Sequence, residues 1–234
     1  MNLSIIVPMY NEEKFIKKII LKIKKINFKK EIFIVDDGST DHSLKFVKTI
    51  KSDKNNKIIL LRNKKNYGKG YSIRKALKRV KNDIIIIQDA DLEYSPFDYY
   101  KLIKPIKCNY TNVVYGSRFL NKKRFSINRG INFKFRAFMN LLLTYFSNFL
   151  NSQKLTDAHT CYKVFHRKLI SRIKLSENGF SFCPEITSEF SRIKEKIVEV
   201  PISFKPRKYS QGKKIQNLDG LKAIITLLKC KFTF

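Results

Sequence analysis

Short apolar runs alternate with amphipathic segments along the first hundred residues. Four runs predict strands, at residues 3–7, 31–35, 58–61 and 84–87. The last run is four consecutive isoleucines, which is typical of a strand buried on both faces. Apolar residues recur at helical spacing between the runs, with lysines among them, which predicts a helix after each of the first three strands. This alternation indicates an α/β domain with a mostly parallel sheet.

The second half predicts further strands at residues 112–115 and 197–204, the latter broken by Pro201, and a short strand through Phe165. Helices are expected at residues 131–150, from Pro184 to about Arg192, and at residues 218–228. The helix at 131–150 either packs on the sheet or presents its phenylalanines to a bilayer or a lipid tail. Because no repeat or linker divides the chain, we expect one domain over residues 1–234.

Three carboxylates follow the isoleucine strand at alternate positions, Asp89, Asp91 and Glu93. Alternate side chains of an extended segment point the same way, so these three can converge. Carboxylate oxygens suit a hard divalent cation such as Mg²⁺ or Mn²⁺, and such an ion suits a diphosphate. An acidic turn after a core strand is the alternative.

Polar residues also follow the first two strands. Asn11 and Glu12 come after the first, and Asp37 comes after the second. Since ligands of parallel sheets bind beyond the carboxyl ends of the strands, these loops and the acidic segment favour one functional site. We expect Asn11 to be the N-cap of the following helix as well. The glycines around Lys69 have neither P-loop nor Rossmann spacing. They indicate either a plain turn or a loop whose backbone comes close to a phosphate group.

The formal net charge of +30 implies an anionic partner, unless biased composition explains the many lysines. The four cysteines form no close pair, which favours free thiols in a reducing compartment. The N-terminus lacks the features of a signal peptide, and no apolar run is long enough to span a bilayer. We therefore expect a cytoplasmic protein, with peripheral contact to a membrane as an open alternative.

These motifs together resemble family-2 glycosyltransferases, in particular the branch of dolichol-phosphate mannose synthases. The resemblance extends over nearly the whole chain and rests on six segments, residues 7–12, 35–41, 89–91, 116–118, 157–163 and 207–213. It implies the GT-A fold of nucleotide-diphospho-sugar transferases. We expect residues 1–115 to form the nucleotide-sugar-binding half and residues 116–234 the acceptor-binding half.

The resemblance also implies roles for single residues. The nucleoside would be held by Pro8, Tyr10, Glu12, Val35 and Asp37, and the phosphates by Arg118, Arg207 and Lys213. Asn11, Lys69 and Ala90 would complete the donor site. Asp89, Asp91 and Glu93 would bind Mg²⁺ or Mn²⁺, although the family often has Gln in place of Glu93, which makes that third ligand less secure.

The reaction implied is an inverting transfer of a sugar from GDP-mannose or a UDP-hexose to a polyprenyl phosphate. That acceptor is already an anion and needs positioning more than a base. A sugar hydroxyl, as in polysaccharide or glycan synthesis, is the alternative acceptor. It would require a carboxylate base, for which Asp157 and Glu185 are the candidates. From another class, a non-enzymatic nucleic-acid-binding module would account for the charge, but the apolar strands and acidic strand ends speak against it.

Overall fold

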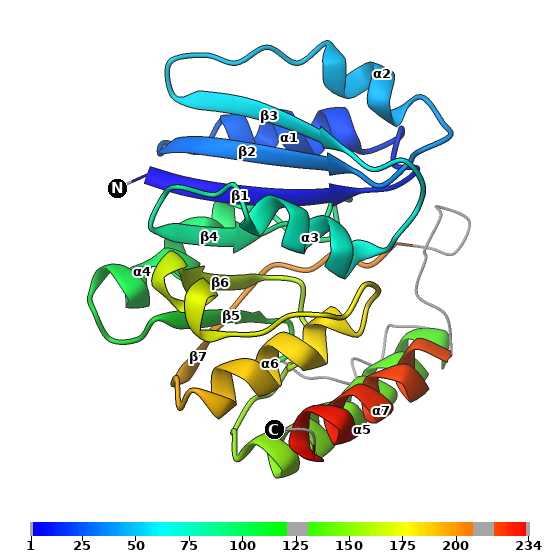
Figure 1. Cartoon of the computed structure of the whole chain (residues 1–234), viewed down its shortest axis with the longest axis vertical. Coiled ribbons are helices and arrows are strands. Elements are labelled where there is room, and N and C mark those ends of the chain that lie inside the picture. Colours follow the sequence, from blue (N-terminus) through cyan, green and yellow to red (C-terminus); the bar gives the residue numbers. More distant parts are fainter. Residues whose placement is uncertain (1, 121–130, 208–217, 233–234) are drawn as a thin grey trace.

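A seven-stranded sheet forms the centre of the structure, a computed structural model that describes residues 2–120, 131–207 and 218–232 (Figure 1). The strand order is β3-β2-β1-β4-β6-β5-β7. β6 is antiparallel to both of its neighbours, whereas the other strands run in one direction. The strands are β1 (Asn2–Met9), β2 (Lys29–Asp36), β3 (Asn56–Arg62), β4 (Ile84–Ile87), β5 (Val113–Ser117), β6 (Lys163–His166) and β7 (Ile197–Pro201). The predicted mostly parallel α/β sheet is confirmed.

Helices connect the strands and cover the sheet. They are α1 (Ile16–Lys24), α2 (Ser43–Lys48), α3 (Lys69–Leu77), α4 (Tyr99–Lys107), α5 (Ile131–Asn151), α6 (Phe182–Arg192) and α7 (Leu218–Phe232), with 3₁₀ turns η1 (Pro96–Asp98) and η2 (Arg167–Arg172). α3 packs on β1 and β2, while α7 contacts both α5 and α6. α5 and α7 lie side by side at the end of the molecule farthest from β3 (Figure 1). Within the described residues, no helix is both long and apolar enough to cross a membrane.

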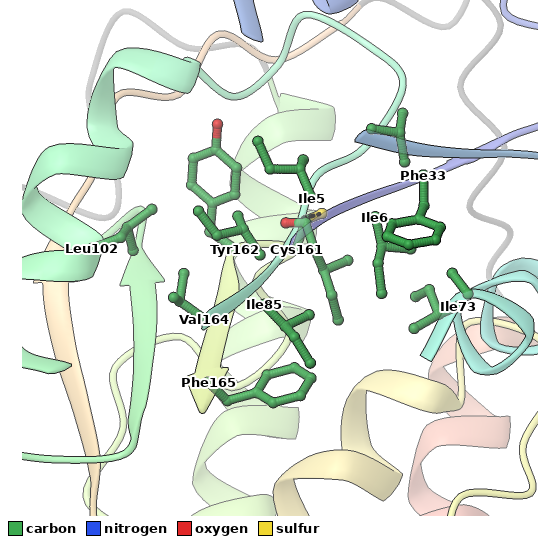
Figure 2. Close-up of a cluster of buried hydrophobic side chains, with 14 of the residues drawn as sticks. Ile5, Ile6, Phe33, Ile73, Ile85, Leu102, Cys161, Tyr162, Val164 and Phe165 are labelled. Atoms are coloured by element: carbon green, nitrogen blue, oxygen red, sulfur yellow. Dashed lines mark hydrogen bonds between the residues drawn. The ribbon is translucent and has the colours of Figure 1, made fainter. Parts of the chain in front are cut away.

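The core is continuous through the central strands. All four isoleucines of β4 are buried, and the strand is central, with β1 and β6 on its two sides. Figure 2 shows Ile6 of β1 near Ile73 of α3, and Phe165 of β6 beside Ile85, its partner in the ladder. Burying each such side chain stabilises the fold by roughly 1.5–3 kcal/mol. This core holds the ends of β1, β2 and β4 in place.

Two expectations about local structure were wrong. Asn11 is not the N-cap of α1, which begins at Ile16 after Phe15. Asn11 instead adopts a left-handed backbone with φ of 46°, which asparagine tolerates, and its amide group bonds Thr40 in the loop after β2. The last predicted strand ends at Pro201 instead of Phe204, although the amide of Ile202 still donates to the Ser117 carbonyl of β5. α4 and the turn before it were not among the predicted elements.

Candidate active site

A cavity of about 490 Å³ lies beyond the carboxyl ends of β1, β2 and β4. Ten of the residues predicted for the donor and metal site line it: Pro8, Tyr10, Glu12, Asp37, Lys69, Asp89, Ala90, Asp91, Glu93 and Arg207. The loops that follow three separate strands therefore meet in one place, as expected for a parallel sheet. Other wall residues were not predicted as site residues, among them Asn66, Gly179 and Phe180.

Several predicted residues do not line this cavity. Val35 is fully buried in the core, and Asn11 holds the neighbouring loop from outside. The residues that line the cavity in the described part of the chain also do not include Arg118, Asp157 or Glu185. Lys213 lies outside the residues that the structure describes.

Asp37 organises one wall of the cavity through its carboxylate. Its Oδ1 accepts hydrogen bonds from the Asn63 side chain at 2.7 Å and the Tyr67 amide at 3.0 Å. Its Oδ2 accepts from the Gly68 amide at 2.7 Å. Gly68 has φ of 102°, in the region that favours glycine, so the turn into α3 depends on this residue type. Asp37 thereby sets where Lys69, the next residue, enters the cavity.

Lys69 and Asp89 form an ion pair inside the cavity, with Nζ and Oδ1 2.5 Å apart. Burial alone would raise the pKa of Asp89, but the Lys69 ammonium outweighs it and the pKa lies below its ordinary value. Burial would also lower the pKa of Lys69, yet Asp89 raises it well above the usual range. Both groups are therefore charged at neutral pH, and together they are close to neutral.

Arg207 gathers the remaining acidic groups of the cavity. Its guanidinium lies 3.0 Å from Glu12 Oε2 and 2.8 Å from Asp91 Oδ2. Its backbone amide donates to Glu93 Oε1 at 2.7 Å. These contacts join the ends of β1 and β4 to the segment after β7, so they complete the cavity from a distant part of the chain.

Asp91 has a different electrostatic environment from Asp89. Burial, followed by the negative charges of Asp89 and Glu93, raises the pKa of Asp91 to about 7. This crowding of carboxylates is a cost that a bound cation would relieve. Asp89 and Asp91 thus fit a hard divalent ion by their chemistry and their place in the cavity.

The expected set of three metal ligands is not assembled in the described part of the chain. No three His, Cys, Asp or Glu side chains there are grouped so that they could hold a metal ion. Lys69 and Arg207 supply the positive charge beside Asp89 and Asp91 instead. An ion that binds here must therefore compete with these two basic side chains.

Arg118 and Asp157 pair with each other away from the cavity wall. Nε and Nη2 of Arg118 donate to the two carboxylate oxygens of Asp157 at 2.6 and 2.7 Å. Burial would raise the pKa of Asp157, but the Arg118 guanidinium lowers it below its ordinary value. A buried carboxylate with a lowered pKa and a bidentate partner is poorly suited to accept a proton.

Glu185 is buried in the first turn of α6. Its carboxylate accepts hydrogen bonds from Ser176 and from the Glu177 amide. It borders a smaller cavity of about 260 Å³, together with Lys229 of α7. Of the two base candidates, neither therefore points its carboxylate into the main cavity.

Comparison with known proteins identifies the family. Residues 4–174 match the family described as glycosyl transferase family 2. The chain belongs to this family. It is 30% identical over 243 aligned residues to UDP-N-acetylglucosamine–dolichyl-phosphate N-acetylglucosaminyltransferase of Methanococcus voltae, covering 97% of this chain and 95% of that protein. The resemblance seen in the sequence motifs is thereby confirmed.

A second relative is undecaprenyl-phosphate 4-deoxy-4-formamido-L-arabinose transferase of Photorhabdus laumondii. It is 23% identical over 90% of this chain, which spans 62% of that protein's length. Glucosyl-3-phosphoglycerate synthase of Mycobacterium tuberculosis, in complex with UDP, has a similar structure, with a TM-score of 0.73 at 16% identity over 98% of this chain and 79% of that one. A complex of that enzyme with Mn²⁺, UDP and glucosyl-3-phosphoglycerate gives a TM-score of 0.69 at 17% identity, over 98% and 80% of the two chains. The GT-A fold is thereby confirmed.

Proposed function

We propose that this family-2 glycosyltransferase moves a sugar, with inversion, from a nucleotide-sugar to a polyprenyl phosphate. One observation carries the proposal: the ends of β1, β2 and β4 form a single cavity that holds Asp89 and Asp91 opposite Lys69 and Arg207. Acidic and basic groups together suit a metal-bound diphosphate. Of the donors considered, GDP-mannose and a UDP-hexose, we favour the UDP-sugar, because the Methanococcus voltae relative is named for UDP-N-acetylglucosamine.

The leaving diphosphate gains negative charge as its bond to the sugar breaks. A divalent cation, Mg²⁺ or Mn²⁺, held by Asp89 and Asp91 would act there as a Lewis acid. Lys69 and Arg207 line the same cavity, so their charged donors would turn from the carboxylates to the phosphate oxygens. We propose that Pro8, Tyr10 and Asp37 border the nucleoside.

The acceptor is proposed from the contacts of the two candidate bases, Asp157 and Glu185. A phosphate anion attacks without losing a proton, whereas a sugar hydroxyl must lose one. Asp157 is engaged by Arg118, and Glu185 is engaged by the backbone near Ser176. Both relatives described above are named as transferases to lipid phosphates, dolichyl and undecaprenyl. A polyprenyl phosphate is therefore preferred over a glycan hydroxyl.

A lipid acceptor requires access to a membrane, and α5 and α7 offer a suitable surface. Their exposed apolar side chains are Phe135, Phe138, Leu141, Leu142, Tyr145 and Phe149 on α5, and Leu218, Leu221, Ile225, Leu228 and Phe232 on α7. Basic residues on the same helices include Lys134, Lys222 and Lys231. We propose that this face rests on the cytoplasmic surface of an anionic membrane, and that residues 116–234 receive the acceptor.

The test is sugar transfer from a panel of radiolabelled UDP- and GDP-sugars with Mn²⁺ and undecaprenyl phosphate. Label should enter an organic-extractable lipid. Asp91→Ala should lower the rate by about 100-fold or more, because the leaving group loses its electrostatic support. Asp83→Ala, at an exposed position before β4, is the matched control and should keep full activity. Label found only in a water-soluble product would favour a hydroxyl acceptor, and full activity of Asp91→Ala would remove the proposed site.

A further inference from the structure

Glu185 holds a loop that reaches the donor cavity. Its Oε1 accepts hydrogen bonds from the amide of Ser176 at 2.7 Å, the hydroxyl of Ser176 at 2.8 Å and the amide of Glu177 at 3.0 Å. Its Oε2 accepts from the same Glu177 amide at 3.1 Å. Glu185 is 3% exposed, so these hydrogen bonds take the place of the water that would solvate an exposed carboxylate. The loop of residues 176–180 is thereby tied to the start of α6.

The other side of this loop binds the first turn of α3. The Asn178 carbonyl accepts from the Tyr71 amide at 3.0 Å, and the Gly179 carbonyl accepts from the Gly70 amide at 3.3 Å. Arg74 donates to the Glu177 carbonyl and, at 2.6 Å, to the side-chain oxygen of Asn178. Amides at the start of a helix have no partner within the helix, so the loop supplies acceptors that α3 lacks.

The loop and α3 fit together without spare room. A methyl group at Gly70 would meet the Glu177 carbonyl oxygen at 2.2 Å, and one at Gly68 would meet the Asn178 oxygen at 2.4 Å. Lys69, between these two glycines, projects into the cavity to Asp89. A displaced loop must therefore move either the backbone beside Lys69 or the wall formed by Gly179 and Phe180.

We propose that Glu185 is a positioning residue, which shapes the donor cavity by holding residues 176–180 against α3. Its carboxylate contacts neither the cavity nor the groups proposed to touch the donor, so it acts through the loop. This inference rests on the proposed function, since the cavity must bind a nucleotide. It also separates Glu185 from the role of general base, which would require the carboxylate to meet an acceptor hydroxyl.

The experiment is a calorimetric titration of the full chain with UDP, and in parallel with GDP, in the presence of Mn²⁺ and without acceptor. Glu185→Ala should weaken the affinity of the nucleotide that binds by about tenfold or more, because the cavity wall loses its support. Glu185→Gln keeps one carbonyl acceptor and should recover part of the affinity. Arg74→Met releases the same loop from its other side and should also weaken nucleotide binding. This second variant tests the role of the loop if Glu185→Ala does not fold.

Glu189→Gln is the matched control. Glu189 is equally buried on α6, but its carboxylate accepts from the Lys174 amide, before the loop, and from Arg192. The control should lose stability while nucleotide affinity stays at the wild-type value. Wild-type affinity in both Glu185→Ala and Arg74→Met would overturn the inference, as would an equal loss in Glu189→Gln. Failure of the wild type to bind either nucleotide would instead contradict the proposed function.

Kinetics supply a second readout. A positioning role predicts that Glu185→Gln raises the KM for the nucleotide-sugar more than it lowers kcat, with the pH profile of kcat unchanged. Loss of an ionisation from that profile, with donor KM at the wild-type value, would identify Glu185 as a base and overturn the inference.

Discussion

The ammonium of Lys69 lies 2.5 Å from Oδ1 of Asp89, in the cavity where a sugar donor is proposed to bind. The pair joins the first residue of α3 to the segment that follows β4. Asp89 is thus neutralised by a residue of the chain itself before any ligand arrives. A divalent cation that uses Asp89 must displace this lysine or share the carboxylate with it.

Replacing Lys69 should therefore strengthen the binding of a metal ion in the absence of donor. We expect Lys69→Met to tighten Mn²⁺ affinity by about tenfold, which corresponds to about 1.4 kcal/mol, because the competing charge is gone. Electron paramagnetic resonance of free Mn²⁺ during a titration measures this. Lys78→Met, at an exposed position on the solvent side just after α3, serves as the control. Unchanged or weaker Mn²⁺ affinity in Lys69→Met would mean that the lysine does not compete.

The pair formed by Arg118 and Asp157 should contribute to stability in a pH-dependent way. Because the pKa of Asp157 is lower in the folded state than in the unfolded state, its contribution is present above the unfolded value of about 4. This contribution to stability is lost as the pH falls through the lower pKa that Asp157 has in the folded state. Asp157→Asn should cost about 3–5 kcal/mol at pH 7, since the Arg118 charge stays buried without its partner. Urea unfolding at pH 7 and at successively lower pH should give a difference from wild type that shrinks below about pH 4. A difference that is constant over that range would contradict the prediction.

The strands and the location of the site could be predicted because they depend on local patterns. The four isoleucines of β4 are apolar on both faces, and only a central strand satisfies that pattern. The polar residues after β1, β2 and β4 then had to meet, because parallel strands end at the same edge. Asn11 shows the limit of such rules. Its side chain could either cap the following helix or bond the loop after β2, and in the structure it bonds Thr40.

The partners within the site could not be predicted because they come from distant segments. The family resemblance placed Arg207 in the donor site, but nothing near Asp91 in the chain indicates that the two will pair, because the contact depends on the segment that follows β7. Gly179 and Phe180 are also part of the cavity wall only because Glu185 and α3 hold their loop. The spacing of the carboxylates suggested a shared metal, whereas the fold gives Asp89 and Asp91 separate basic partners.

Two glycines should respond in opposite ways to a methyl group. Gly70→Ala should destabilise the protein by about 1–3 kcal/mol, because its methyl group would meet the Glu177 carbonyl oxygen at 2.2 Å. Gly220→Ala, in α7, has its nearest neighbour at 4.0 Å in Leu143 and should stabilise the helix by up to about 1 kcal/mol. Urea midpoints of the two variants measure this. Equal midpoints would show that the loop of residues 176–180 can move away from α3 at little cost.

The exposed aromatic residues of α5 should carry much of the binding to a membrane. Tyr145 and Phe149 are 74% and 75% exposed, and burying such side chains is worth roughly 1.5–3 kcal/mol each. The double variant Tyr145→Ser and Phe149→Ser should therefore weaken binding to vesicles that contain anionic lipid by at least about tenfold, measured by flotation. Phe97→Ser, 57% exposed in η1 and away from α5, should bind as wild type does. Binding by wild type should also decline as salt screens the charge of the basic residues. Retention of binding by the double variant would mean that another surface meets the membrane, whereas wild type that stays unbound at low salt would remove the membrane from the proposal.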